Sequence, residues 1–217
     1  MSERSTLSTA SDERVIHTRL EDGTRVCIRT IRPDDEARLR EGISRMSDRS
    51  RYLRFFTGLR VPPPHVIERL LDADGDQHIA WGAIASDLPG EPAIGAVHAI
   101  AAQVDDNGGN DGGDTPTRLA EFSVAVIDEF HDRGLGRLLT ATILLDAAEA
   151  GYEEFQAWTL AENTRAIGFI RALGATLTGR EDSALEYHLP VAGAIEALRA
   201  ECDPPGLADV FRAFREP

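Results

Sequence analysis

Apolar and polar residues alternate in short stretches along this chain, and residues that favour turns separate most of these stretches. Such alternation is typical of half-buried β-strands. Asp22-Gly23 favours a tight turn between the first two stretches, and the last two are expected to form a closing hairpin. We expect strands at 15–20, 25–31, 79–86, 92–103, 120–126, 155–160, 176–179 and 184–189.

Between the strands, apolar residues recur at the spacing of one helix face. Pro33 followed by the acidic run 34–36 resembles a helix start, and Gly174 fits a helix end. We expect helices to begin at 33–36 and 134–137 and to cover 48–56, 65–71, 163–173, 192–201 and 207–215. Strands come first and a β-α-β-α-β-β order follows. This order indicates an α/β (α+β) domain with a mixed, mostly antiparallel sheet flanked by helices.

The composition divides the chain into three parts. Residues 1–13 are almost all polar and are expected to form a disordered tail. Residues 14–190 are expected to form one domain, which suits a chain of 217 residues. Residues 191–217 are expected to be a C-terminal helical extension, whose apolar side chains either pack on the core or form a dimer surface. The polar segment 104–117 is expected to be a solvated loop, either a hairpin tip or a flap that faces the substrate.

The net charge of −14 argues against nucleic acid or an anionic membrane as the main partner. No apolar run approaches the roughly 20 residues that cross a bilayer, and the N-terminus lacks the apolar stretch of a secretory signal. Cys27 and Cys202 do not make a disulfide framework or a metal cluster, and the histidines lack metal-ligand spacing. We therefore expect a soluble, cytoplasmic protein of bacterial type that binds no metal.

The most specific chemical signal is AEFSVAVIDEFHDRGLGR at 120–137. A predicted strand runs into a short loop, and Gly134 and Gly136 then open an apolar helix. The N–H groups at a helix start have no partner within the helix, and the helix dipole adds positive charge there. Glycine lets an anion approach the main chain, so this segment suits a phosphate or pyrophosphate. The spacing matches neither the dinucleotide fingerprint nor a nucleotide P-loop.

Two charged residues near this helix start have alternative interpretations. Glu121, on the strand before the helix, is a candidate general base, since a carboxylate can take a proton from an attacking amine. Its alternative is a strand glutamate that faces solvent or pairs with an arginine. Arg137 either contacts a phosphate or lies exposed on the helix.

VAVIDEFHDRGLGRLL followed by WTLAENTRAIGFIRALGA resembles the acetyl-CoA-binding core of the GNAT N-acetyltransferases. The resemblance covers roughly 25–189 and implies the GNAT fold, with acetyl-CoA as the acyl donor. It implies strand main-chain contacts to the pantetheine arm, amides of the helix start around the pyrophosphate, and an asparagine contact to the pantetheine or the adjoining chain. By this resemblance, Val124 and Val126 would make the strand contacts, and Asn163 would make the asparagine contact. The amides around the pyrophosphate would be those of Arg133, Gly134, Leu135, Gly136 and Arg137.

The chain departs from the family pattern at two positions. His131 stands where the family usually has glutamine or arginine, a small change if main-chain amides do most of the phosphate binding. Ile170 stands where the family commonly has a tyrosine that protonates the departing thiolate. A thiol with a pKa near 8.5 can leave as the thiolate, so the reaction does not depend on that tyrosine.

The segment LEDGTRVCIRTIRPDDEARLREGISRMSDRSRYLRFF resembles a narrower branch, the bacterial protein-lysine acetyltransferases. That resemblance implies Glu121 as the base and a protein lysine as the leading acceptor. Arg51, Tyr52 and Arg54 are candidates to line the acceptor site, with Phe55 and Phe56 packing inward; the alternative for them is core aromatics and surface arginines. The alternative functions are a small-molecule amine acetyltransferase and a non-catalytic acyl-CoA-binding domain.

Overall fold

The computed structural model describes residues 14–56, 59, 62–102, 118–201 and 204–215. In this part of the chain, eight strands form one sheet in the order β1-β2-β3-β4-β5-β6-β8-β7. Neighbouring strands are antiparallel except β5 and β6, which are parallel. The strands are Val15–Arg19 (β1), Arg25–Thr30 (β2), His78–Ala85 (β3), Ala93–Ala101 (β4), Leu119–Val126 (β5), Glu154–Leu160 (β6), Thr176–Glu181 (β7) and Ala184–Pro190 (β8).

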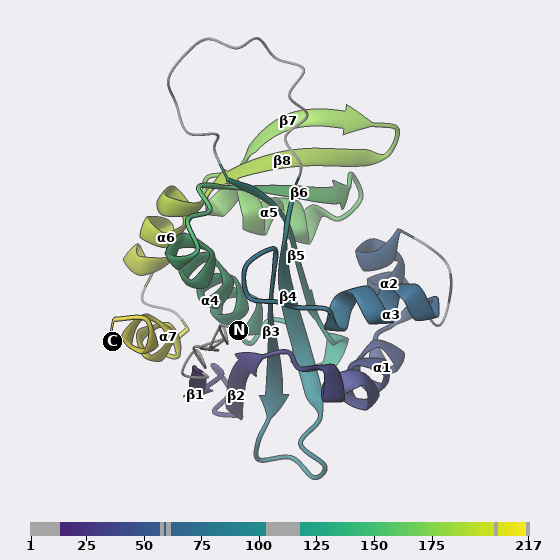
Figure 1. Ribbon diagram of the computed structural model, residues 1–217, viewed down its shortest axis with the longest axis vertical. Helices are drawn as coiled ribbons and strands as arrows, with labels where there is room; N and C mark the ends of the chain where they lie inside the picture. The colour runs from purple at the N-terminus through teal and green to yellow at the C-terminus, as the bar shows by residue number, and fades with distance from the viewer. Residues whose placement is uncertain (1–13, 57–58, 60–61, 103–117, 202–203, 216–217) are drawn as a thin grey trace, which may run out of the picture.

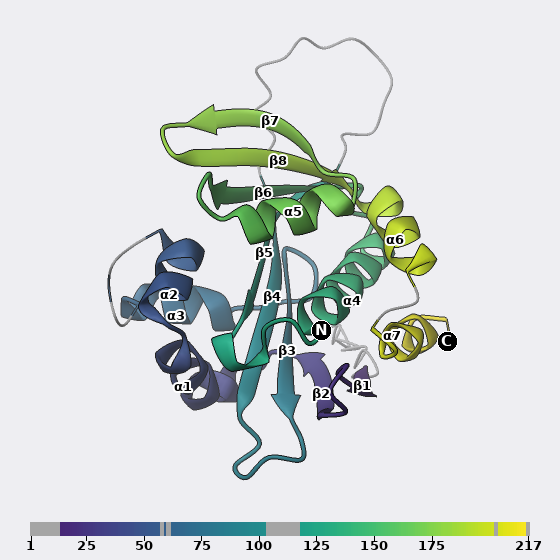
Figure 2. The ribbon, with the colours of Figure 1, turned by 180° about the vertical axis from the view of Figure 1, so that it is seen from behind.

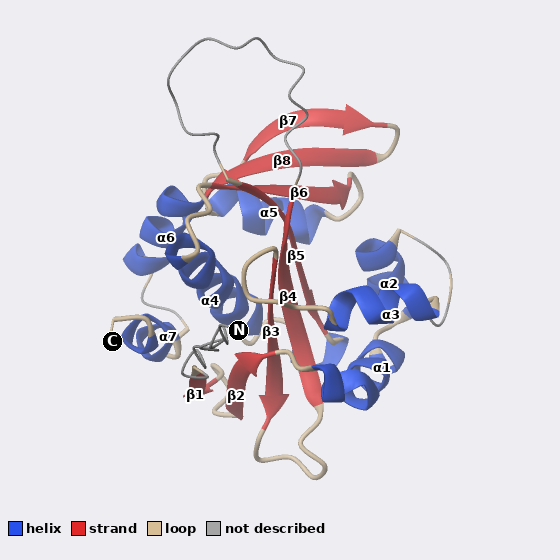
Figure 3. Cartoon of the chain, in the orientation of Figure 1, coloured by secondary structure: helices blue, strands red, loops and turns tan. Residues whose placement is uncertain are grey.

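Helices cover both faces of this sheet. In Figures 1 and 2, α1, α2 and α3 lie on one side of the central strands, and α4, α6 and α7 lie on the other. Figure 3 shows α5 running alongside β6 and β8, which fan out across the top of the molecule. The α-helices are Glu36–Arg45 (α1), Asp48–Phe55 (α2), Pro64–Leu71 (α3), Leu135–Glu149 (α4), Thr164–Ala172 (α5), Val191–Ala200 (α6) and Leu207–Ala213 (α7).

These elements confirm the predicted mixed, mostly antiparallel sheet flanked by helices. The turn at Asp22-Gly23 joins β1 to β2, and Gly23 takes the left-handed φ of 87° that such a turn favours. The acidic run at the start of α1 has a structural role. Asp35 is buried and accepts two hydrogen bonds of 2.7 Å from Arg29, which tie the helix start to β2.

The main core lies between α4 and the sheet. α4 is apolar on nearly all sides because it contacts β3, β4 and β5 on one side and α6 and α7 on the other. Leu198 of α6 and Leu207 and Val210 of α7 belong to this core and are at most 3% exposed. These apolar side chains of the C-terminal segment therefore pack on the core, the first of the two predicted alternatives.

Two predicted segments lie outside the described residues, namely the tail at 1–13 and the loop at 104–117. Among the helices that the structure describes, none combines the length and the apolar character needed to cross a membrane.

Candidate functional site

β5 and β6 run side by side over a short distance and then separate. Only Leu119, Ala120 and Glu121 of β5 pair with residues of β6. Beyond Glu121, β5 stays paired with β4 as far as Val126, and β6 stays paired with β8. The separation opens a cavity of about 940 Å³, lined by parts of α2, β5, β6, α5 and the start of α4.

The main chain along one edge of β5 faces this cavity. The Ile127 N–H donates to the carbonyl of Ile94 on β4 at 3.0 Å, so the peptide groups of Ile127 point toward β4. Because successive strand residues direct their peptide groups to opposite edges, those of Val124 and Val126 point into the cavity. There the Val126 carbonyl accepts a hydrogen bond from Nε2 of His131 at 2.9 Å. An extended ligand arm in the cavity can therefore pair with this strand edge.

The first turn of α4 closes one end of the cavity. The Gly134 carbonyl accepts hydrogen bonds from the N–H groups of Arg137 and Leu138, at 3.0 and 3.2 Å. The N–H groups of Leu135 and Gly136 come before these, where the helix supplies no carbonyl. A Cβ built on Gly136 meets no atom within 4 Å, so the main chain is open on that side. This turn can hold a phosphate through its amides and the helix dipole.

The backbone conformation and the packing at position 134 both require glycine. Gly134 is the N-cap of α4 with φ of 84°, a conformation that side chains rarely adopt. A Cβ at this position would lie 2.6 Å from a Pro204 carbon and 2.9 Å from Oε1 of Glu21. The start of α4 is therefore packed against both the β1–β2 turn and the segment before α7.

The two arginines of the predicted phosphate loop have different surroundings. Arg133 donates to Asp22 at 2.6 Å, and its side chain does not line the cavity. Arg137 does line the cavity, where its Nε donates to Glu201 at 2.8 Å. Of these two arginines, Arg137 is therefore the one placed to meet a ligand phosphate with its side chain.

Asn163 lines the cavity at the start of α5. It is the N-cap of α5, and its side-chain oxygen accepts a hydrogen bond from the Ala166 N–H at 3.2 Å. Asn163 and Ile170 both line the cavity, and Ile170 is 5% exposed. Its apolar side chain has no proton to donate, so any acid for a leaving group comes from another residue or from water.

Glu121 lies at the point where the two strands separate. It is exposed and lines the cavity, and it shares one sheet face with Ser123. Arg54 of α2 donates to Ser123 Oγ at 2.8 Å. Burial lowers the pKa of Arg54 to about 10, and the Glu121 carboxylate opposes that shift, so the guanidinium stays charged at neutral pH.

Asp128, just after β5, holds the start of α2. It accepts hydrogen bonds of 2.7–2.8 Å from the Ser47 N–H, the Ser47 hydroxyl and the Ser50 hydroxyl. Burial opposes its ionised form, but the bonds from Ser47 and Ser50 lower the pKa of Asp128 to about 2. A negative charge thus ties α2 to the end of the strand that carries Glu121.

A buried pair of histidines lies behind Arg54, and no pattern in the sequence predicted their contact. His78 Nδ1 lies 2.9 Å from the Asp72 carbonyl, and His78 Nε2 lies 3.0 Å from His98 Nδ1. A carbonyl only accepts, so Nδ1 of His78 carries its proton and Nε2 accepts from His98. Burial, the Arg54 charge and His78 hold the pKa of His98 well below its usual range. The available signal was that His98 lies in one predicted strand and His78 directly precedes the neighbouring one.

The buried neutral His98 makes stability depend on pH. In the unfolded chain it binds a proton below about pH 6.5, whereas in the folded chain it stays neutral, so stability falls as the pH drops through that value. We expect a slope of up to about 1.4 kcal/mol per pH unit between pH 6.5 and 5 from this group. His98→Asn keeps a donor toward His78 and should reduce the slope, as measured by urea unfolding at several pH values.

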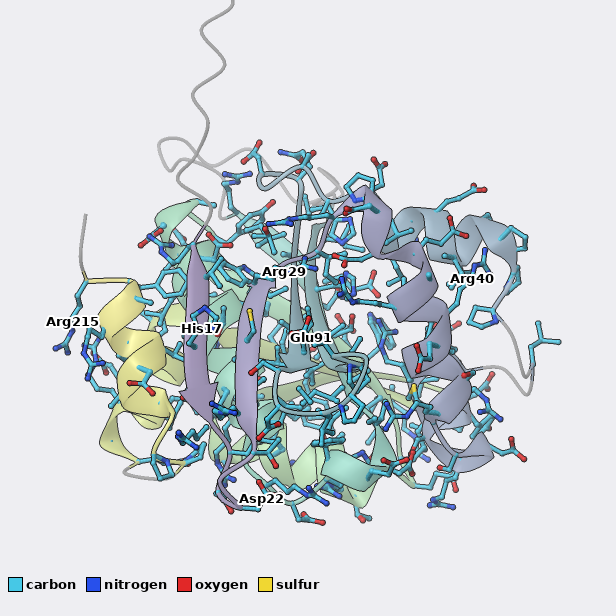
Figure 4. The ribbon with its side chains drawn as sticks, turned by 90° about the horizontal axis from the view of Figure 1, so that it is seen from below. His17, Asp22, Arg29, Arg40, Glu91 and Arg215 are labelled. Carbon is cyan, nitrogen blue, oxygen red and sulfur yellow. The ribbon has the colours of Figure 1, made fainter. Side chains whose placement is uncertain are left out.

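The matched control is His17→Asn. His17 lies on β1, the exposed edge strand beside α7 (Figure 4), and has no comparable burial. An unchanged slope in His98→Asn, or an equal reduction in His17→Asn, would show that His98 is not the source.

The other α2 residues predicted at the acceptor side are placed differently. Tyr52 is exposed and does not line the cavity, and Arg51 is buried and pairs with Asp48. Phe55 packs partly against the core, as predicted. The prediction that Phe56 packs inward is wrong: it is 46% exposed, because it ends α2 in a left-handed conformation with φ of 54°.

Known proteins are similar to this chain in sequence and in fold. The sequence model described as the acetyltransferase (GNAT) family matches residues 48–175, from the start of α2 to just beyond α5. The acetyltransferase PA5475 of Pseudomonas aeruginosa is 26% identical over 155 residues, which cover 71% of this chain and 77% of that protein. The acetyltransferase Pat of Mycolicibacterium smegmatis is 29% identical over 155 residues.

The match to Pat covers 71% of this chain and 42% of Pat, so the chain spans less than half of that relative. Among solved structures, the GNAT domain of PAT from S. lividans superposes with a TM-score of 0.69 at 24% identity. That superposition covers 81% of this chain and 96% of the domain, and it shows a shared fold.

Proposed function

Because this chain belongs to the acetyltransferase (GNAT) family, we propose that it transfers an acetyl group from acetyl-CoA to a primary amine, with a protein lysine side chain as the acceptor. The observation that carries the proposal is the separation of β5 from β6, with Glu121 at its vertex. The two substrates meet at this point, the coenzyme along the strand edge and the amine beside the carboxylate.

The cavity has the features that acetyl-CoA requires. Amide-containing pantetheine can pair with the exposed main chain of Val124 and Val126. The pyrophosphate fits the open amides of Leu135 and Gly136, with the guanidinium of Arg137 beside them. Asn163 closes the other side. The thioester then lies near the vertex, at the far end of the arm from the phosphates.

The proposed reaction is direct attack of the amine on the thioester. The neutral amine nitrogen forms a bond to the acetyl carbon, Glu121 takes the proton that the nitrogen loses, and the carbon–sulfur bond breaks. The coenzyme leaves as a thiolate, which Ile170 does not protonate. The enzyme contributes mainly by holding amine and thioester in reacting geometry.

The exposure of Glu121 supports a protein acceptor. A small-molecule amine is better held in an enclosed pocket, whereas here the carboxylate is open to solvent and a lysine on a protein surface can reach it. The net charge of −14 attracts cationic side chains in general. A small-molecule amine is the second candidate acceptor, because the cavity of about 940 Å³ has room for one beside the coenzyme.

The test is thiol release from acetyl-CoA by the purified protein. Intact acyl-CoA synthetases are compared with a panel of small amines, and Glu121→Gln serves as the inactive reference. Turnover with an intact protein, lost when one acceptor lysine is changed to arginine, is the expected result. Turnover with small amines alone would contradict the protein acceptor, and acetyl-CoA binding without any turnover would support a non-catalytic domain.

A further inference from the structure

Glu121 lies on the face of the sheet that α2 covers. The next residue, Phe122, stacks on Phe155 of β6 with ring centroids 5.4 Å apart, and both rings belong to the main core beneath α4. Side chains alternate between the two faces of a strand, so Glu121 and Ser123 lie on the face away from α4. There Ser123 accepts its hydrogen bond from Arg54 of α2.

The proposed coenzyme site and the carboxylate thus belong to different sides of the cleft. α4, whose first turn is proposed to hold the pyrophosphate, packs on the opposite face of the sheet from α2. Phe169 of α5 packs against the same core as α4. An amine that meets the thioester from the other direction therefore approaches Glu121 from the α2 side.

Trp158 of β6 stands on that side of the cleft as well. Gln156 is the β6 residue that pairs with Glu121, so these two side chains share one face. Trp158 is two residues further along β6, on the same face and beyond the last pairing with β5. It is half-buried and lines the cavity. The indole ring is therefore part of the cavity wall on the approach to Glu121.

Apolar side chains of α2 line the cavity opposite this strand. Leu53 is half-buried and Phe56 is exposed, and both line the cavity from the helix that contacts β6. At the rim, Arg49 of α2 pairs at 3.8 Å with Glu162, which follows β6. The α2 side of the cleft thus combines three apolar side chains with a carboxylate and a charged rim.

This combination matches the chemistry of a lysine side chain. Lysine carries its amine on a flexible four-carbon stem, which can pack on apolar surface while the nitrogen reaches a polar group. The stem spans roughly 6 Å, and two residues of a strand span roughly 7 Å. An amine nitrogen at Glu121 therefore leaves its stem within reach of the Trp158 ring. A much shorter amine reaches the carboxylate without contacting that ring.

We propose that Trp158 determines which amines are accepted: its ring packs against the alkyl stem of a primary amine of lysine length and holds the nitrogen beside Glu121. Leu53 and Phe56 contact the same stem from α2. This inference rests on the proposed function and narrows its acceptor to amines on an unbranched stem of about four carbons.

Kinetics of the full chain with two acceptors test the proposal. Nα-acetyl-lysine methylamide has the full stem, and the corresponding diaminopropionate derivative has a single methylene. Each buried methylene is worth about fourfold in affinity, so Trp158→Ala should raise KM for the lysine derivative about 10-fold with kcat within about twofold. KM for the short amine should not change. Trp158→Phe keeps an apolar ring and should recover most of the loss.

Leu177→Ala is the matched control, because Leu177 is an exposed apolar residue on β7 that does not line the cavity. It should leave both KM values unchanged, and thermal unfolding checks that each variant is folded. An equal rise in KM for the long and the short amine, or no rise for either, would overturn the inference.

Fluorescence quenching provides a measurement that needs no turnover. The chain has two tryptophans, and Trp81 is 1% exposed, so acrylamide quenches mainly Trp158. The protein is first saturated with S-ethyl-CoA, a thioether that transfers no acyl group. Adding the lysine derivative should then lower the quenching constant about twofold or more, because a packed stem covers the ring. The diaminopropionate derivative should not. Equal protection by both amines, or full protection by S-ethyl-CoA alone, would overturn the inference.

The two measurements separate the failure of this inference from that of the proposed function. If the wild-type protein transfers no acetyl group, the proposed function is wrong, while quenching still tests whether Trp158 binds an alkyl stem. If acetyl transfer occurs but the lysine derivative does not protect Trp158, the inference is wrong and the proposed function stands.

Discussion

Glu121→Gln is expected to lower kcat by about 10²- to 10⁴-fold at neutral pH. Glutamine keeps the size of the side chain but cannot take the proton from the attacking amine. The acetyl-CoA Kd should stay unchanged, because the strand edge and helix start that are proposed to hold the coenzyme are main-chain features. Steady-state kinetics with an amine acceptor and calorimetry with acetyl-CoA measure the two quantities.

The size of this loss should depend on pH in a definite direction. A lysine amine has a pKa near 10.4, so most of it is protonated at pH 7 and more of it is neutral as the pH rises. An enzyme without a base therefore recovers activity at high pH, and the ratio of wild-type to Glu121→Gln rates should shrink between pH 7 and 10. A constant ratio would mean that glutamine disturbs the site in another way.

Glu129→Gln is the matched control. Glu129 lies close in sequence to the cleft, but it is exposed, pairs with Arg45 and does not line the cavity. It should leave kcat unchanged at every pH. Full turnover of Glu121→Gln at both neutral and high pH would show that Glu121 is not the base.

Local patterns in the sequence were sufficient to predict the individual elements. Alternation predicted the strands, Asp22-Gly23 predicted the first hairpin, and Gly134 and Gly174 marked a helix start and a helix end, where both adopt positive φ. These features depend on neighbouring residues, which a single sequence displays. The order of the last strands depends on pairing between distant segments, and the sequence alone does not show that β8, rather than β7, lies next to β6.

The parts of the site that were missed are contacts between distant residues. Arg54 and Ser123 are 69 positions apart, and His78 and His98 are 20 apart. Arg54 was predicted either to line an acceptor site or to be a surface arginine. Its half-buried position follows from how α2 is anchored at Asp128, a contact that no local pattern encodes. Phe56 was placed wrongly for a related reason, since its exposure depends on where α2 ends.

The same long-range packing changes which glycine best tests the predicted phosphate site. A bulky residue at Gly134 would block the approach of an anion to the main chain. In the structure it would also collide with Pro204 and Glu21 and would have to adopt φ of 84°. Loss of coenzyme binding in such a variant could therefore come from a damaged helix start, so Gly134 is a poor probe.

Gly136 is the better probe, and Gly136→Val is expected to weaken acetyl-CoA binding by about 100-fold. A side chain there projects into open space, so the fold tolerates it, and a helical position generally favours other residues over glycine. The same side chain would fill the space in front of the amides. Losing two hydrogen bonds to a charged phosphate costs about 3 kcal/mol, which is about 100-fold in Kd.

A graded series makes the steric cause visible. Gly136→Ala should weaken binding less than Gly136→Val, because the methyl group leaves part of the space open. Gly193→Val on α6 is the control, since Gly193 is helical, exposed and away from the cavity, and its Cβ would make only an ordinary contact of 3.9 Å. Calorimetry with acetyl-CoA gives the Kd, and thermal unfolding checks each fold. An unchanged Kd in a folded Gly136→Val would mean that the coenzyme phosphates bind elsewhere, because a side chain at this position leaves no room for them against the first turn of α4.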